Sequence, residues 1–406
     1  MSDISHKDQS KAPLHGIRVI DIGTMVAGPV AATLMADFGA EVIKVEQPKV
    51  GDTLRQLGPF AQDESLWWNV DGRNKKSITL NLRTQKGQNL LRKLIKQADV
   101  LVENFRPGTL KKWGLDYESL ASINENLIML SVSGFGQTGP YSNRAAYDRM
   151  ALSFSGLMGI NGDPNHPPVR FGTSIADYTA ALMGAYAVMM GLYHRSANSG
   201  RGQHIDLALY EAIFRMSESM VSAYDQLGVV RKRTGNLHYG AAPGNNFLLN
   251  DGRYMTLTIS GDRLFNLLCQ AMNKPDLVEI DRFATHQSRW EHIEELNSIV
   301  ADWLVNTPVE KVQEALETHG IPFSFVMSVD EIMENPQYKA RENIAKVAHD
   351  KLGTLKMQSV VPRMSETPGV KIKSAPKLGE HNEEVFQNIL GLTAQEMAKL
   401  TEKEII

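Results

Sequence analysis

Cysteine is almost absent from this chain of 406 residues, since Cys269 is the only one. A disulfide within the chain is therefore excluded, and so is a zinc site built from several cysteines. This usage is typical of a reducing compartment, and we expect a cytoplasmic protein that holds no metal ion. Cys269 lies in the apolar run 267–271, which predicts a buried structural thiol.

An excess of charge and a long hydrophobic run are also missing. The 43 Lys and Arg residues against 46 Asp and Glu leave a net charge of −3, so we expect no nucleic-acid partner. The longest apolar stretch, residues 178–193, is shorter than the roughly 20 residues that span a bilayer. We expect a buried helix there and no membrane partner. Residues 1–14 begin polar, without the apolar core of a signal peptide, and predict a mobile tail.

Several motifs that identify common enzyme classes do not occur. The sequence contains no G-x-S-x-G elbow, no H-E-x-x-H zinc pair and no phosphate loop of the Walker type. Residues 134–139 match G-x-G-x-x-G, but Pro140 and a polar turn follow where a dinucleotide-binding motif must open a helix. A nicotinamide or flavin site is therefore not indicated.

The hydrophobic pattern that is present alternates between strands and helices. A strand at 17–22, a helix at 30–38 and a strand at 41–46 form one βαβ unit. Because the alternation continues, the sequence predicts an α/β fold with a Rossmann-like, doubly wound large domain. The further predicted strands are 77–81, 99–103, 127–133 and 204–209, and the helices are 86–97, 117–123, 175–195 and 210–227.

The composition and hydrophobic pattern of the chain change after residue 227. Residues 228–250 are loop-rich and basic, which is typical of a linker. A strand at 254–259 and then mostly helical patterns predict a smaller, mostly helical α+β domain over 251–343. Residues 344–406 are expected to form a second linker and to return to the large domain. The large domain would then consist of 15–227 and the end of the chain.

One carboxylate stands where a loop enters the long apolar helix. Ser174 and Asp177 match the S-x-x-D pattern of a helix capping box, which is the simpler interpretation. Alternatively, Asp177 is a nucleophile held against an apolar wall. A carboxylate that attacks an activated acyl group forms a mixed anhydride, which suits exchange between a thioester and a carboxylic acid if water is excluded.

Several short motifs occur together in a specific order. They are Val26–Pro29, Gly39–Glu46, Asn74–Ser77, Val102–Gly108, Ser133–Pro140, Asp177, Gly200–Gln203 and Ala375–His381. Because these motifs occur in this order, the chain resembles a family III CoA-transferase over nearly its full length. That family contains formyl-CoA transferase, carnitine CoA-transferase, succinyl-CoA:dicarboxylate transferases and α-methylacyl-CoA racemases.

The resemblance implies a mechanism and an assembly. Asp177 would be the nucleophile, forming an acyl anhydride and then a thioester with coenzyme A before an incoming acid collects the CoA. Asp148 would be a second acid near it, or an ion partner of Arg144 or Arg149. Gly261 would belong to a loop that closes over the anhydride. Family members form interlocked homodimers, so a homodimer is expected.

The resemblance also implies where coenzyme A binds. Val26 and Ala27 follow the first strand, at the crevice where such folds bind ligands. Asn104 and Phe105 occupy the next contact positions, and a basic residue near the phosphates corresponds to Lys112. The further cationic candidates are Arg73, Lys75, Lys76, Arg106 and Arg144. Any one of these cations could instead be a solvated surface charge.

Two other functions remain open at this stage. A racemase needs two bases flanking the substrate α-carbon, and Tyr147 stands where that branch of the family has histidine, so transferase is favoured. A noncatalytic CoA-binding protein is the third alternative, against which Asp177 argues. For the acceptor acid we expect a dicarboxylate or short hydroxy acid, because Arg144 and Arg170 lie near the active-site segments and could bind a distal carboxylate.

Overall fold

The computed structural model describes residues 12–406, and most of the predicted tail 1–14 lies outside the described residues. The chain divides into two compact units. The large unit contains the residues up to 158 together with 170–228 and 337–406, and the small unit contains 159–169 and 229–336. Segment 159–169, which we expected in the large domain, therefore groups with the small unit.

The large unit is built on a sheet of six strands that pair only in parallel. Numbered along the chain, their spatial order is 3-2-1-4-5-6, the doubly wound order in which two βαβ halves meet between the first and fourth strands. The predicted α/β fold with a parallel central sheet is thus confirmed. From edge to edge the strands are β5 (Lys75–Thr79), β2 (Glu41–Glu46), β1 (Arg18–Asp21), β6 (Val100–Glu103), β7 (Ile128–Ser133) and β8 (His204–Ala208).

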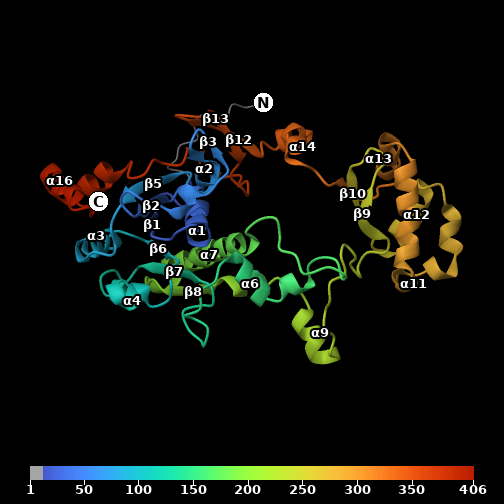
Figure 1. Cartoon of the computed structure of the whole chain (residues 1–406), viewed down its shortest axis with the longest axis horizontal. Coiled ribbons are helices and arrows are strands. Elements are labelled where there is room, and N and C mark those ends of the chain that lie inside the picture. Colours follow the sequence, from blue (N-terminus) through green and yellow to red (C-terminus); the bar gives the residue numbers. More distant parts are fainter. Residues whose placement is uncertain (1–11) are drawn as a thin grey trace. The chain divides into compact units, whose positions relative to one another are not determined.

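Residues of the four inner strands β2, β1, β6 and β7 enter two separate hydrophobic cores, one on each face of the sheet. Val19 and Val100 face helices α1 and α7, whereas Ile20 and Leu101 face α3 and α16. Figure 1 shows α1 and α7 side by side, with α3 and α16 on the other side of the strands. Because helices cover both faces of the sheet, its strands appear in the sequence as nearly continuous apolar runs. These helices are α1 (Ala27–Ala36), α3 (Gln85–Ile95), α7 (Ile175–His194) and α16 (Ala394–Glu402).

Helix α7 is buried along one side only. Ala180 and Gly184 belong to its buried face, and a Cβ at Gly184 would lie 2.8 Å from Leu130 of β7. The opposite face exposes Leu182, Tyr186, Met190 and Tyr193. The prediction of a buried helix is therefore right for one face. By length and composition alone, residues 175–198 could cross a membrane. The buried core helix of a globular protein passes the same test.

Two short helices replace the single helix predicted over 210–227. Helix α8 (Leu209–Phe214) ends before a turn in which Glu218 has φ of 52°, and α9 (Met220–Leu227) follows. This left-handed residue interrupts the helical path. Helix α6 (Asp148–Phe154) was not predicted, and it packs against α7 and α8.

The end of the chain covers the edge of the sheet. The His381 N–H donates to the carbonyl of Ser77 at 2.9 Å, and the Thr79 N–H donates to the Asn382 side chain at 2.8 Å. Edge strand β5 is thereby protected from pairing with another strand. Both ends of the described chain thus contribute to the large unit. Its remaining elements include β3 (Phe60–Ala61), β4 (Glu64–Ser65), α2 (Leu66–Asp71), α4 (Thr109–Trp113), α5 (Tyr117–Ala121), β12 (Ile344–His349) and β13 (Gly353–Gln358).

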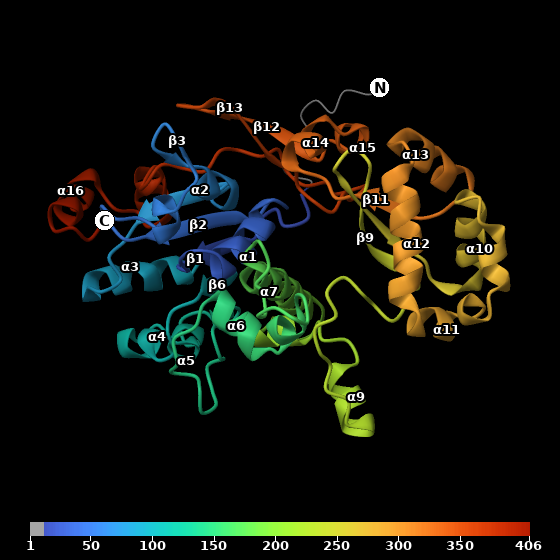
Figure 2. The same ribbon diagram turned by 45° about the vertical axis from the view of Figure 1, so that its right-hand side comes forward.

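The small unit is an antiparallel sheet covered by helices, and Figure 2 shows α12 beside its strands. Strand β9 lies inside the segment that we expected to be a linker, because Phe247 enters the core of this unit. Cys269 is fully buried on α10, as predicted, and burial raises the pKa of its thiol to about 11. The elements are β9 (Gly244–Leu248), β10 (Tyr254–Thr258), β11 (Phe323–Phe325), α10 (Gly261–Ala271), α11 (His286–Glu291), α12 (Ile293–Asn306), α13 (Val309–Thr318) and α14 (Val329–Glu334).

Candidate active site

A cavity of about 410 Å³ opens at the carboxyl ends of β1, β6 and β7 in the large unit. The order of the strands reverses between β1 and β6, and ligands of doubly wound folds bind at this point. Seven residues predicted from the sequence line the same cavity. They are Val26, Ala27, Asn104, Phe105, Arg106, Arg144 and Asp177.

Two loops form the wall at the reversal point, one after β1 and one after β6. Asn104 joins them, because its side-chain oxygen accepts from the Thr24 N–H at 2.8 Å and its amide donates to the Thr24 carbonyl at 2.8 Å. Glu103, buried beneath the second loop, accepts from the Phe105 N–H at 2.8 Å. Burial raises the pKa of Glu103 to about 7. Sequence reasoning missed this support, which the position at the end of a buried strand could have indicated.

Asp177 lies in the first turn of α7 and lines the cavity. Ser174 makes no capping hydrogen bond through its side chain, so the capping-box interpretation is wrong. Within residues 12–406 the Asp177 carboxylate has no hydrogen-bond partner. Burial first, and the charge of Asp148 second, raise its pKa to about 7.

Asp148 caps α7 from the neighbouring helix α6. Its carboxylate accepts from the Ala176 N–H at 2.7 Å and from the Asp177 N–H at 3.4 Å, the latter a long contact. These N–H groups lie in the first turn of α7, where backbone N–H groups have no carbonyl partner within the helix. No ion pair of Asp148 with Arg144 or Arg149 occurs in the described part of the chain. Asp148 therefore positions the start of α7 and places a second negative charge near Asp177.

Three of the predicted phosphate-binding cations lie elsewhere and are already paired. Arg73 is buried against Asp37, with 2.5 Å between Nη2 and Oδ2. Lys75 is buried and donates to Asp21 at 2.9 Å. Lys76 pairs with Glu41 and Glu384, each at 2.6 Å. None of the three lines the cavity and each is already paired with a carboxylate, so the structure does not support their assignment to the phosphates.

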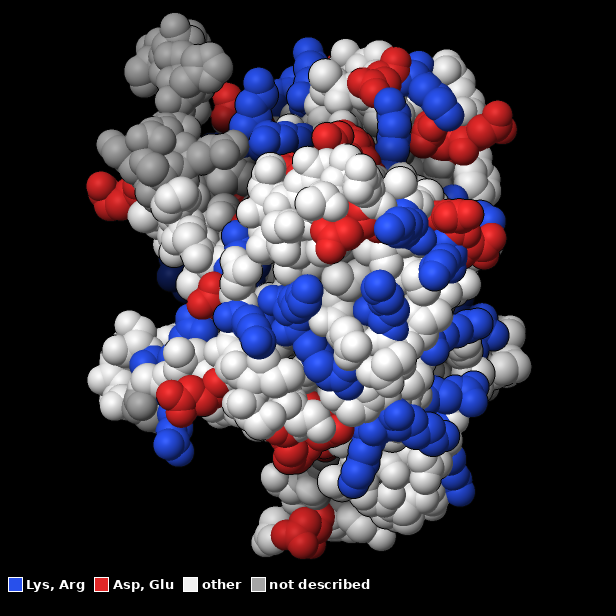
Figure 3. Space-filling view, turned by 90° about the vertical axis from the view of Figure 1, so that its left-hand side faces the viewer, with Lys and Arg blue, Asp and Glu red and all other residues white. Residues whose placement is uncertain are grey.

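Arg106 and Arg144 are the cations of the cavity wall. Arg106 is exposed, and the Arg144 guanidinium lies 3.6 Å from the centre of the Tyr141 ring. Lys112 does not line the cavity, but it is exposed on α4, which begins three residues after Arg106. Figure 3 shows Lys and Arg side chains gathered over the face that carries α3 and α4. This surface can attract a highly anionic ligand.

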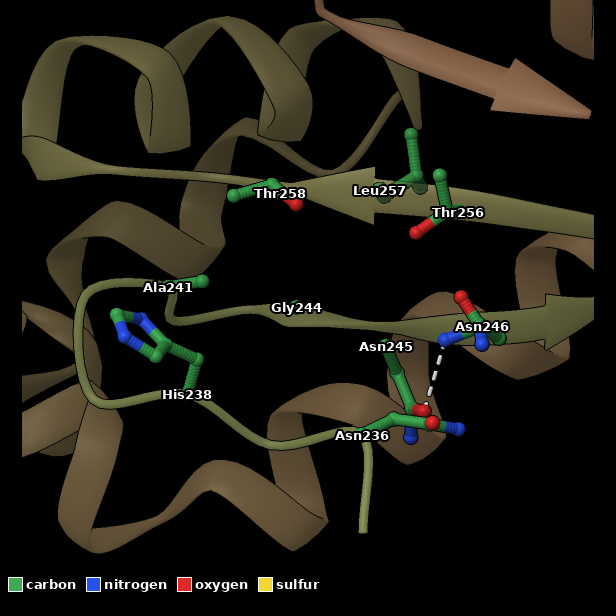
Figure 4. Close-up of a pocket in the computed structure, with 9 residues that line it drawn as sticks. All are labelled: Asn236, His238, Ala241, Gly244, Asn245, Asn246, Thr256, Leu257 and Thr258. Carbon is green, nitrogen blue, oxygen red and sulfur yellow. Dashed lines mark hydrogen bonds between the residues drawn. The ribbon is translucent and has the colours of Figure 1, made fainter. Parts of the chain in front are cut away.

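The small unit has a separate cavity of about 260 Å³ (Figure 4). Its wall is made of amide, hydroxyl, imidazole and apolar groups, without a carboxylate that could carry an acyl group. Gly261 follows strand β10 of this unit, has φ of 79° and begins helix α10. The lining residues are Asn236, His238, Ala241, Gly244, Asn245, Asn246, Thr256, Leu257 and Thr258.

The cavity of the large unit also contains residues that sequence reasoning missed. Gly134 lies in the loop after β7, where an added Cβ would come within 2.5 Å of the Ala146 Cβ. Gly134 therefore permits the close approach of two cavity-lining segments, and a turn rather than a helix follows, as predicted. Among the described residues no group of three or more His, Cys, Asp and Glu could hold a metal ion. The lining residues that were not proposed as ligand contacts are Thr24, Met25, Thr53, Pro107, Val132, Ser133, Gly134, Ala145, Ala146, Tyr147 and Leu209, of which Pro107, Ser133, Gly134 and Tyr147 belong to segments that the sequence already singled out.

Comparison with known proteins gives a consistent result. The model of CoA-transferase family III matches residues 14–382. The chain is 43% identical to succinyl-CoA–D-citramalate CoA-transferase of Chloroflexus aurantiacus, over 97% of this chain and 98% of that protein. It is 42% identical to the succinyl-CoA–L-malate CoA-transferase β subunit of the same organism, over 97% and 98%. A solved CAIB/BAIF family protein from Brucella suis superimposes with a TM-score of 0.83 at 33% identity, covering 93% of this chain and 99% of that one.

Proposed function

Because this chain belongs to CoA-transferase family III, we propose that it moves CoA from succinyl-CoA to a hydroxy dicarboxylic acid through an acyl anhydride on Asp177. The observation that carries the proposal is the Asp177 carboxylate. It lines a cavity at the reversal point of the sheet and has no hydrogen-bond partner within residues 12–406. A carboxylate oxygen that faces the cavity without a partner is available to attack an acyl carbon.

The proposed reaction has four balanced steps. An Asp177 oxygen attacks the thioester carbonyl carbon, the carbon–sulfur bond breaks, and CoA leaves as a thiolate. The thiolate attacks the Asp177 carbonyl of the anhydride and releases the donor acid. The carboxylate of the incoming acid then attacks the Asp177 thioester and releases the thiolate again. Attack of this thiolate on the new acyl group yields the new acyl-CoA and regenerates Asp177.

The surroundings of Asp177 suit this chemistry. Burial removes water that would solvate the carboxylate, and a poorly solvated anion is more reactive. Asp177 also lies in the first turn of α7, where the N-terminal end of a helix favours negative charge. Exclusion of water also protects the anhydride, because hydrolysis would waste the energy of the thioester.

The two arginines of the cavity suit the two kinds of anion. Exposed Arg106, with Lys112 nearby on α4, is placed to attract the CoA phosphates. Arg144 lines the cavity together with Asp177 and can form a bidentate pair with the distal carboxylate of a dicarboxylic acid. The names of the two Chloroflexus relatives favour the same acids, since citramalate and malate are hydroxy dicarboxylates.

The racemase alternative is less well supported. Removal and return of an α-proton need two bases on opposite sides of the carbon. The cavity wall contains Asp177 but no histidine, and Tyr147 occupies the position at which we expected the racemase base. A racemase would incorporate solvent deuterium at the α-carbon of the acyl-CoA, and we expect none.

The assembly that we propose is a homodimer. The exposed stripe of Leu182, Tyr186, Met190 and Tyr193 on α7 supports this, because a monomeric surface rarely leaves such a continuous apolar face in water.

The proposal is tested by measuring transfer from succinyl-CoA to a panel of acids, with detection of each new thioester. We expect L-malate or citramalate among the acceptors, and Asp177→Asn should lower the rate by at least about a thousandfold while CoA still binds. Normal transfer by Asp177→Asn would exclude Asp177 as the nucleophile. An Arg144→Lys variant should raise the KM of the acceptor acid, because lysine cannot form the bidentate pair with its distal carboxylate.

A further inference from the structure

The loop after β1 contains a strained residue. Met25 lines the cavity and has φ of 63°, a left-handed conformation that residues with a side chain adopt only at a cost. Such strain persists only where neighbouring groups hold it. A positive φ at a non-glycine residue in a ligand cavity therefore calls for a structural cause.

Asp52 is the group that holds this backbone. One of its oxygens, Oδ1, accepts from the Met25 N–H at 2.9 Å and from the Leu54 N–H at 2.9 Å. Asp52 is 2% exposed and is the N-cap of a short 3-10 helix that follows β2. Within residues 12–406, Asp52 contacts the strained loop through one hydrogen bond, from the Met25 N–H, and this bond requires the Met25 N–H to point toward the carboxylate.

Lys44 fixes the other side of the same carboxylate. Its ammonium lies 2.8 Å from Asp52 Oδ2, and it also donates to the Gly23 carbonyl, at the beginning of the strained loop. Both side chains of this pair are completely shielded from solvent. Burial raises the pKa of Asp52, but attraction to Lys44 and the two backbone N–H groups outweigh this and leave the pKa below its usual value. The carboxylate is therefore ionised at neutral pH.

We propose that Asp52 is a positioning residue of the acyl-CoA site: paired with Lys44, it holds Met25 in the left-handed conformation that shapes the cavity wall. This inference rests on the proposed function, since the ligand is taken to be CoA. Asp52 itself does not line the cavity, whereas Met25, Val26 and Ala27 do. Its effect on the ligand is therefore exerted through the backbone of the loop.

The test measures CoA binding by calorimetry and the kinetic constants for succinyl-CoA in the full-length protein. Asp52→Asn keeps the size of the side chain and removes its charge. We expect the Kd of CoA and the KM of succinyl-CoA to rise about tenfold, with a much smaller change in kcat, because a charge-assisted bond to the loop is weakened.

A double-mutant cycle separates positioning from general destabilisation. Glycine adopts positive φ without penalty, so in a Met25→Gly background the loop no longer depends on Asp52. The effect of Asp52→Asn on Kd should fall from about tenfold to about twofold in that background. An equal effect in both backgrounds, or no effect on Kd in either, would overturn the inference.

Asp37→Asn is the matched control. Asp37 is also buried and paired with a buried cation, Arg73, but it lies at the C-terminal end of α1 and does not line the cavity. We expect it to lower the melting temperature while the Kd of CoA stays unchanged. If Asp52→Asn does not fold, Met25→Val should weaken CoA binding far more than Met25→Gly, and equal weakening would overturn the inference.

The experiment can refute the proposed function and the role of Asp52 separately. Absence of CoA binding by the unsubstituted protein would refute both. Normal binding by that protein with an unchanged Kd in Asp52→Asn refutes only the role of Asp52.

Discussion

At the scale of single residues, the ionisation of Asp177 controls the proposed chemistry. The attacking group must be the carboxylate, and burial raises its pKa to about 7. Transfer should therefore be slow at pH 6 and rise through pH 7 to a plateau near pH 8. Single-turnover acylation by succinyl-CoA as a function of pH checks this. A rate already at its plateau at pH 5 would contradict the raised pKa.

Glu103 provides the control for this profile, since its pKa is also raised to about 7 by burial. Glu103→Gln can still accept the Phe105 N–H, so it should leave the inflection where it is. An inflection that disappears in Glu103→Gln would assign the profile to Glu103 and not to Asp177.

Asp148 contributes the second charge near Asp177, and removing a like charge favours ionisation. Asp148→Asn should therefore move the inflection to lower pH, while the asparagine oxygen can still accept from the Ala176 N–H. An inflection shifted to higher pH would mean that Asp148 does not act through its charge.

The raised pKa of Asp177 also has a consequence for stability. The folded state holds this proton more tightly than the unfolded state, so the contribution is favourable at low pH and is lost as the pH rises through about 7. Asp177→Asn should therefore raise the free energy of unfolding at pH 8 by on the order of a few kcal/mol, and with it the melting temperature, and change both little at pH 4. Thermal unfolding at the two pH values tests this, and an equal effect at both would contradict the shift.

At the scale of elements, the sequence predicts helices and strands that have a clear hydrophobic period. It does not predict which faces are buried, because this depends on packing against distant segments. The βαβ unit from β1 to β2 was predictable because apolar residues alternate there with a helix of suitable length. The exposed face of α7 was not, since Leu182 and Val188 look alike in the sequence and only the position of the sheet separates them. Strand β9 was missed because Asn245 and Asn246 interrupt its apolar pattern.

The same difference applies to the candidate site. Asp177, Val26 and Asn104 were predictable from the resemblance to family III CoA-transferases, which assigns these positions to the nucleophile and to CoA. Arg73 and Lys75 were predicted to bind phosphate because their actual partners, Asp37 and Asp21, are 36 and 54 positions away in the sequence. Long-range ion pairs of this kind leave no local signal.

Gly184 is a prediction at the scale of helix packing. A Cβ there would meet the Leu130 side chain at 2.8 Å, and a valine would force α7 away from β7. Gly184→Val should lower the free energy of unfolding by about 1–3 kcal/mol, as overpacking commonly does. Denaturant unfolding measures this, and a valine variant as stable as the parent would show that the helix has room to move.

At the scale of the whole molecule, the two compact units and the apolar stripe of α7 are the features that matter. If the stripe is a dimer interface, the double substitution Leu182→Glu and Tyr186→Glu should convert the protein to monomer. Sedimentation at low protein concentration checks this. The control is Lys93→Glu, because Lys93 is exposed on α3 at the other face of the sheet, and this substitution should leave the dimer intact. A folded, active monomer in the unsubstituted protein would exclude the dimer.

The central claim is that Asp177 carries the acyl group and then CoA. The most direct measurement incubates the protein with succinyl-CoA, adds hydroxylamine, and maps the modified peptide by mass spectrometry. We predict a hydroxamate at Asp177 that forms only when succinyl-CoA is present and that is absent from Asp177→Asn. No modification of Asp177 under turnover conditions, or a hydroxamate at another carboxylate such as Asp148, would contradict the account.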